Sequence, residues 1–229
     1  MKTYTIALIV ILIFAVFYIF LLDNSLSFVL TDTHTYILLG KSLSLGQGYR
    51  QIWLPGNPEY KKTPPFFPLL LAPIIYFLGY NFFVMKLICV ITAIGSLGLV
   101  YLLFKRLKQS MALIILLLCG FSFQFVYYSQ QILTEIPYLF FSLLALIFAK
   151  KAANRKNFYS GMLIFAIFFI LISFFTRTIG ASLGISMFIY LLLERRRYST
   201  QSRFLKDIIL LAFFIFIPIF LWKCCWLHL

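Results

Sequence analysis

The sequence predicts an all-α, polytopic membrane protein, and its composition, hydropathy and long apolar runs support this class. Hydrophobic residues make up 63% of the 229-residue chain and charged residues 11%, against about 45–50% and about 25% in a soluble domain. The mean hydropathy is +1.00. Several apolar runs approach the roughly 20 residues that a helix needs to cross a bilayer. A soluble enzyme, a disordered tail and a secreted disulfide scaffold are therefore excluded.

Seven apolar runs are expected to cross the membrane. They cover residues 4–22, 82–104, 111–128, 136–149, 158–175, 179–193 and 208–222. The first run follows Lys2 and lacks a small-residue cleavage site, so we interpret it as an uncleaved span and not as a signal peptide. We expect one membrane domain over residues 1–229. It comprises a first span at 1–22, an outer loop at 23–65, a short helix at 66–79 and six further spans within 80–229.

The basic residues predict the orientation of these spans. The chain has 20 Lys and Arg residues against 6 Asp and Glu, and cytoplasmic loops of membrane proteins carry an excess of Lys and Arg. As a helix the apolar run at 66–79 reaches only about 21 Å, against a hydrocarbon core of about 30 Å. If this run does not cross, most basic residues fall on the cytoplasmic side, and if it crosses, most fall outside. We therefore expect a surface or re-entrant helix at 66–79 and a cytoplasmic N-terminus.

The same charge excess does not predict a nucleic-acid partner, because the chain has no basic stripe interleaved with exposed aromatic residues. The expected orientation instead places Asp32, Glu135 and Arg177 at the outer surface, each beside the end of an apolar run. These residues are the first candidates for chemistry at the membrane surface.

The outer loop from Asp23 to Pro65 is the only long polar segment, and long loops between spans are often functional. Within it, Tyr36, Leu39 and Leu43 recur at helical spacing, which predicts a short amphipathic helix over 31–45 lying on the membrane surface. Glycines and prolines between 46 and 58 then indicate turns. Prolines at 64 and 65 suit the first turn of the next helix.

Three stretches of this chain resemble a known family. Residues 32–36 read Asp-Thr-His-Thr-Tyr, residues 46–49 read Gly-Gln-Gly-Tyr, and residues 62–66 read Lys-Thr-Pro-Pro-Phe. Together they look like the first outer loop of polyprenyl-phosphate-sugar-dependent glycosyltransferases of the GT-C fold, such as protein O-mannosyltransferases and the aminoarabinose transferase that acts on lipid A. Leu-Thr-Glu-Ile-Pro at 133–137 resembles the second outer acid of that family, and Phe-Thr-Arg-Thr-Ile-Gly at 175–180 resembles its later basic step.

The resemblance implies a sugar donor carried on a polyprenyl phosphate, and a glycan, lipid or protein acceptor at the outer face. The acceptor hydroxyl would attack the anomeric carbon and the lipid phosphate would leave, which requires a base and a cation. Asp32 is the expected base and Glu135 the second carboxylate. Arg177, with Lys62 and Lys86, is expected to bind the donor phosphate.

Each candidate also has a purely structural interpretation. Asp32 could cap a helix, and Glu135 could compensate a helix dipole. Arg177 and Lys86 could extend to the membrane interface, and Lys62 could bind lipid headgroups. A divalent cation shared by the two carboxylates stays open, with unknown ligands, because two acids are too few to define a metal site. No other cofactor is expected.

Two further function classes compete with a glycosyltransferase. A transporter component usually places ionisable residues or broken helices at mid-membrane, whereas the candidates here lie at the outer ends of the runs. Members of the resembling family are typically longer than this chain. We therefore expect a truncated copy, with a catalytically inactive membrane scaffold as the alternative. The expected location is a bacterial plasma membrane.

Overall fold

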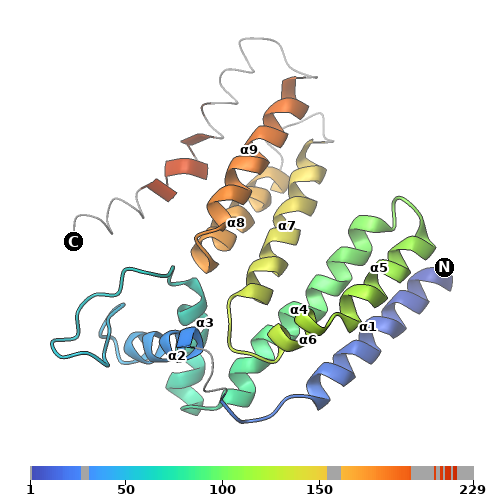
Figure 1. Cartoon of the computed structure of the whole chain (residues 1–229). Coiled ribbons are helices and arrows are strands. Elements are labelled where there is room, and N and C mark those ends of the chain that lie inside the picture. Colours follow the sequence, from blue (N-terminus) through green and yellow to red (C-terminus); the bar gives the residue numbers. More distant parts are fainter. Residues whose placement is uncertain are drawn as a thin grey trace. The chain divides into compact units, whose positions relative to one another are not determined.

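The computed structural model describes residues 2–26, 31–153 and 161–196, together with 209, 212–213, 215–217 and 219–220. The chain divides into two compact units, Met1–Phe140 and Phe141–Leu229. Named helices account for most of the described residues (Figure 1). They are α1 Lys2–Phe20, α2 Thr31–Ser44, α3 Phe66–Leu78, α4 Phe82–Phe104, α5 Gln109–Phe121, α6 Phe123–Ser129, α7 Glu135–Ala153, α8 Gly161–Thr176 and α9 Gly180–Arg196.

The predicted all-helical membrane class is confirmed, whereas the predicted number of spans is only partly supported. Helices satisfy their backbone polar groups internally, as a hydrocarbon environment requires. In the described part of the chain, α4 and α7 are long and apolar enough to cross a membrane, and α5 with α6 would make a third. The apolar parts of α1, α3, α8 and α9 are shorter, and they cover Tyr4–Phe20, Phe66–Leu78, Gly161–Thr176 and Gly180–Glu194. The span expected at 208–222 lies largely outside the described residues, so seven crossings stay a prediction.

The single helix expected at 111–128 is broken, which corrects the sequence prediction. Helix α5 ends at Phe121 and α6 begins at Phe123, and the two are bent by 59°. Ser122 between them has a ψ of 123°, outside the helical region. A break exposes backbone carbonyls, and the Tyr18 hydroxyl of α1 donates to the carbonyl of Gly120 at 2.7 Å. The break is therefore stabilised by a contact with a helix that is distant in the sequence.

Helices α1, α4 and α5 pack against one another in the first unit (Figure 1). Their shared core includes Phe14 and Tyr18 of α1, Val90 and Leu97 of α4, and Leu116 of α5. The N-terminal half of the unit therefore holds its helices together through apolar side chains buried between them.

Helix α2 packs on α3, and together they form the structured part of the first loop. The helix expected at 31–45 is confirmed, and two residues of its predicted apolar face, Tyr36 and Leu39, are buried. The close approach depends on Gly40, where an added Cβ would lie 3.0 Å from Ile75 and 3.2 Å from Leu71. The described part of the first long loop is therefore an ordered layer and not a loose connection.

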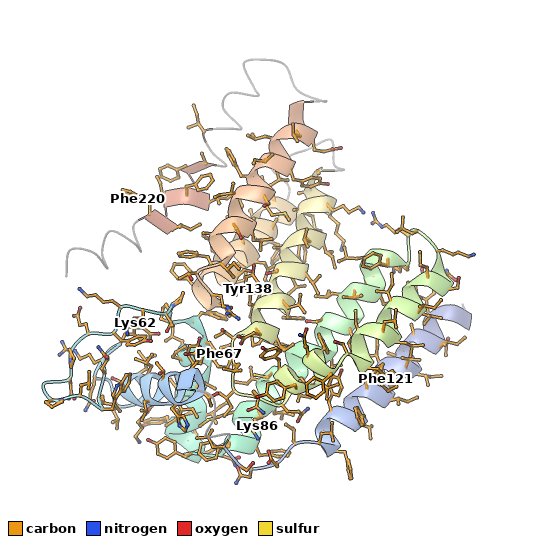
Figure 2. The ribbon with its side chains drawn as sticks, viewed as in Figure 1. Lys62, Phe67, Lys86, Phe121, Tyr138 and Phe220 are labelled. Carbon is orange, nitrogen blue, oxygen red and sulfur yellow. The ribbon has the colours of Figure 1, made fainter. Side chains whose placement is uncertain are left out.

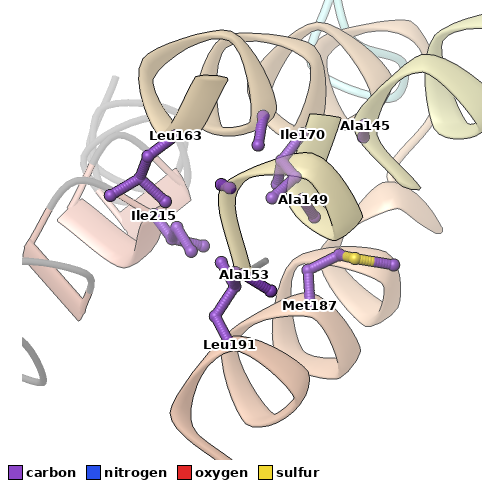
Figure 3. Close-up of a cluster of buried hydrophobic side chains, with 10 residues drawn as sticks. Ala145, Ala149, Ala153, Leu163, Ile170, Met187, Leu191 and Ile215 are labelled. Atoms are coloured by element: carbon purple, nitrogen blue, oxygen red, sulfur yellow. The ribbon is translucent and has the colours of Figure 1, made fainter. Parts of the chain in front are cut away.

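The second unit has its own core (Figure 3). It is built from small residues of α7, such as Ala145 and Ala149, packed against larger ones of α8 and α9, such as Leu163, Ile170 and Leu191. Small residues let membrane helices approach closely. The α8–α9 turn brings Gly180 against the backbone of α8, where an added Cβ would lie 2.6 Å from the Cα of Phe174.

We expect Gly180→Ala to lower the melting temperature of the detergent-solubilised protein, because its Cβ would overlap backbone atoms of Phe174 that cannot move aside. Overpacking of this kind costs about 1–3 kcal/mol. Gly184→Ala is the matched control one turn further along α9, since its Cβ would sit 3.4 Å from Ile215, at ordinary contact distance. Equal melting temperatures for the two variants would contradict the close approach at residue 180.

Candidate functional site

Asp32 lies in the first turn of α2, exposed to solvent. Tyr36 follows one helical turn later, on the same side of the helix. Its ring packs edge-on against Phe67 of α3, with the ring centroids 5.4 Å apart, and its hydroxyl lies 3.4 Å from the Oγ1 of Thr134. Both hydroxyl-bearing side chains are buried. Tyr36 therefore joins the start of α2 to the segment that leads into α7.

Glu135 is the first residue of α7, and its side chain is half-buried. The residues before it are fixed in place: Thr134 is buried, and the Sγ of Cys89 in α4 contacts the carbonyl of Leu133 at 3.5 Å. Since Thr134 precedes Glu135 directly, the Tyr36–Thr134 contact brings the Asp32 motif and the Glu135 motif into one region of the first unit.

Tyr49 connects the turn at Gly46–Gly48 with the residues before α3, Thr63 and Pro64. Its hydroxyl lies 3.0 Å from the carbonyl of Thr63 and 3.2 Å from that of Pro64, and it donates its single proton to these acceptors. The turn itself is closed by Ser42, whose hydroxyl donates to the Gly48 carbonyl at 2.8 Å. Burial raises the pKa of the Tyr49 phenol well above its usual range, so it stays a donor at neutral pH.

Tyr60 lies beside the candidate site, and the sequence analysis did not identify it. It is buried, and its ring meets those of Tyr49 and Trp53 at centroid distances of 5.8 and 6.0 Å. Burial raises the pKa of the Tyr60 phenol, and the negative charge of Asp32 raises it further. Tyr60 therefore lies within electrostatic reach of Asp32. An aromatic residue two positions before Lys62 is the sequence signal that could have pointed to it.

The two lysines expected to bind phosphate lie in different environments (Figure 2). Lys62 is exposed on the segment that precedes α3, whereas Lys86 is buried near the start of α4. The Nζ of Lys86 forms an ion pair with Asp23, whose side chain is 59% exposed. Hydrogen bonds from Lys86 and Ser25 lower the pKa of the Asp23 carboxyl. The charge of Lys86 is therefore already balanced by a carboxylate.

Arg177 belongs to the second unit, in the turn between α8 and α9, and is half-buried. Its backbone N–H donates to the carbonyl of Ser173 at 3.0 Å, and its carbonyl accepts from the N–H of Gly180 at 2.8 Å. The backbone of Arg177 is thus held by a closed turn, which presents its side chain at the junction of two apolar helices.

Within the residues that the structure describes, no group of three or more His, Cys, Asp and Glu side chains could hold a metal ion. In the first unit, Asp32 and Glu135 lie on two segments that the Tyr36–Thr134 contact joins, and Lys62 lies on the segment that precedes α3. Carboxylates can accept a proton and a lysine can bind a phosphate, so the residue types of this unit suit the expected chemistry.

A protein-family model matches residues 62–222, which is more than half of the chain. The family is described as dolichyl-phosphate-mannose-protein mannosyltransferase. The matched region contains Lys62, Lys86, Glu135 and Arg177, whereas Asp32 precedes it. No curated protein and no solved structure gives a significant match.

We expect Tyr49→Phe to loosen the loop between α2 and α3, because the carbonyls of Thr63 and Pro64 would lose their donor. Leaving buried acceptors unpaired costs about 1–3 kcal/mol, which raises local opening about fivefold or more. Limited trypsin digestion after Arg50 should accelerate accordingly. Tyr76→Phe is the matched control, since Tyr76 is 69% exposed on α3. Unchanged cleavage in Tyr49→Phe would contradict this anchoring role.

We expect the Asp23–Lys86 ion pair to make stability depend on acid pH. The pKa of Asp23 is lowered in the folded protein, so its contribution is present above the unfolded carboxyl pKa of about 3.9. The contribution is lost as the pH falls through the folded pKa. Melting temperatures of the parent and Asp23→Asn should differ at neutral pH and converge in acid. Glu59→Gln, which changes an exposed carboxylate, is the control. A difference that persists unchanged in acid would argue against the pair.

Proposed function

We propose that this protein, whose chain belongs to the dolichyl-phosphate-mannose-protein mannosyltransferase family, is an active enzyme. In this proposal it transfers a sugar to an acceptor hydroxyl at the outer face of the membrane. Family membership makes it an integral membrane glycosyltransferase that uses a polyprenyl-phosphate sugar donor. The proposal adds a hexose or pentose as the sugar and a glycan, lipid or protein as the acceptor. It also adds a cytoplasmic N-terminus and a bacterial plasma membrane as the location.

The observation that carries this proposal is the contact between Tyr36 and Thr134. It joins two segments that are 98 residues apart in the sequence, and each segment contributes one carboxylate, Asp32 or Glu135. A structural cap needs no such partner segment, because helix capping is a local interaction. Two carboxylates from distant segments in one polar region support a catalytic interpretation.

In the proposed reaction, Asp32 is the general base. Its carboxylate takes the proton of the acceptor hydroxyl as the hydroxyl oxygen forms a bond to the anomeric carbon of the sugar. The bond between that carbon and the phosphate oxygen breaks, and the polyprenyl phosphate leaves with the electron pair. Asp32 suits this role because it is exposed at the start of α2. Glu135 would orient the acceptor.

The leaving phosphate gains negative charge as the bond breaks, and cations stabilise such charge. Lys62 is exposed beside the ordered outer loop, so it is available to a phosphate without breaking an existing pair. Arg177 can bind two phosphate oxygens with its guanidinium group. Lys86 would reach a phosphate only by exchanging its partner Asp23, which makes it the least accessible of the three proposed cations.

Two other functions compete with this proposal, a transporter component and an inactive scaffold. In helices α4 and α7, the ionisable residues are Lys86, Glu135, Lys150 and Lys151, and all lie near helix ends. Transport pathways usually place such groups at mid-membrane, so this distribution favours surface chemistry. An inactive scaffold would retain the family fold without the reaction, and the experiment below separates it from an enzyme.

We expect Asp32→Asn to abolish sugar transfer from labelled polyprenyl-phosphate sugar pools in membranes that contain this protein. Loss of a general base costs about 10²–10⁴ in rate. Glu59→Gln is the matched control, because Glu59 is an exposed carboxylate of the same loop. Its variant should retain the parent rate.

Immunoblotting and melting temperature would first show that both variants are present and folded. Transfer that survives in Asp32→Asn would remove this residue from the proposed role. Absence of transfer in the parent protein at normal abundance would support the scaffold.

A further inference from the structure

The tip of the outer loop carries an apolar surface that the proposed reaction does not use. The exposed fractions are 38% for Trp53 and 42% for Leu54, which are adjacent in the sequence. Large apolar side chains that gather in a polar loop usually mark an interaction surface. Trp in particular is enriched where a membrane meets water, because its ring is apolar and its indole N–H is polar.

The tip is held in a defined shape. The N–H of Gln51 donates to the carbonyl of Pro58 at 2.8 Å, and the N–H of Tyr60 donates to that of Tyr49 at 2.9 Å. The ring of Trp53 rests edge-on against the buried Tyr60. The loop therefore presents Trp53 and Leu54 from a fixed base, so that the exposed apolar area does not depend on a chance conformation.

The base of this loop lies at the start of an apolar helix. The Tyr49 hydroxyl contacts the carbonyls of Thr63 and Pro64, directly before α3 begins at Phe66. Helix α3 itself exposes large apolar residues, including Tyr76 and Phe77, as a helix in contact with lipid would. The base of the loop is consequently tethered to the N-terminal end of an apolar helix.

The basic residues beside the loop tip indicate which kind of partner surface the tip would contact. Arg50 and Lys61 are both exposed and flank the apolar residues at the two ends of the loop, and Lys62 follows. Glu59 is the single acid between residues 33 and 85 of the sequence. Basic side chains beside an apolar, Trp-containing tip are complementary to anionic lipid headgroups, which attract Lys and Arg near the membrane surface.

We propose that residues 50–61 form a membrane-interface anchor, in which Trp53 and Leu54 insert among lipid headgroups while Arg50 and Lys61 bind the phosphates of anionic lipids. The anchor would keep the ordered outer loop, and with it Asp32, against the membrane from which a lipid-borne substrate arrives. The proposal concerns lipid contact alone, and its test therefore does not require sugar transfer.

The test uses the full chain with Trp222→Phe and Trp226→Phe, which leaves Trp53 as the only tryptophan. The protein is reconstituted in bilayers that contain anionic lipids with brominated acyl chains, and Trp53 fluorescence is measured at low salt. We expect strong quenching by the brominated lipids and protection from aqueous acrylamide. Replacement of the anionic lipids by zwitterionic ones, or addition of salt, should reduce the quenching.

Charge-neutral variants test the basic residues. Arg50→Gln and Lys61→Gln should each lower the ratio of docked to undocked loop about fivefold. Lys41→Gln is the matched control, because Lys41 lies over the ring of Tyr80 at 5.8 Å and outside the loop tip. Free access of acrylamide to Trp53 in bilayers, with no quenching by brominated lipids, would overturn the anchor. Protection of Trp53 by a soluble glycan instead of by lipid would overturn it as well, in favour of acceptor binding.

Discussion

The candidate site depends on the contacts that the side chain of Tyr36 makes with Phe67 and Thr134. Its ring lies against Phe67 of α3 and its hydroxyl reaches Thr134 at the start of α7, so three segments meet at one residue. Tyrosine suits this position because it combines an apolar body with a polar tip that needs a partner when buried. The segments that carry Asp32 and Glu135 also share an apolar cluster, in which Tyr36 and Ile37 are buried with Ile132 and Leu133.

Close helix packing supports this arrangement. Helices in lipid gain little from the hydrophobic effect between one another, so they rely on short contacts at small residues. Gly40 lets α2 settle on α3, and Gly120 leaves space for Phe14 beside the break between α5 and α6. The same principle operates in the second unit, where alanines of α7 line the core. The candidate site residues of the first unit thus lie on or next to helices whose positions are set by apolar contacts.

The few acidic residues in the described first unit occupy distinct environments. Asp23 forms an ion pair with the buried Lys86, and Glu135 is the first residue of α7. The negative charge of Asp32 contributes to the raised pKa of the Tyr60 phenol. A buried lysine without a carboxylate partner would be costly, because charges lose solvation when they leave water. The ion pair therefore explains why Lys86 is tolerated inside α4. Of the two lysines of this unit that were expected to bind phosphate, Lys62 is the exposed one.

The sequence by itself determined the helical membrane class and most helix positions, because apolar composition and run length are local properties. Residues 82–104 were predicted as a helix and form α4, and the helix expected at 31–45 forms α2. The motif residues also indicated the family. Only the tertiary structure decided the break at Ser122, the burial of Tyr60 and the pairing of Lys86 with Asp23. These features arise from contacts between distant segments, and a hydropathy pattern contains no information about which segments meet.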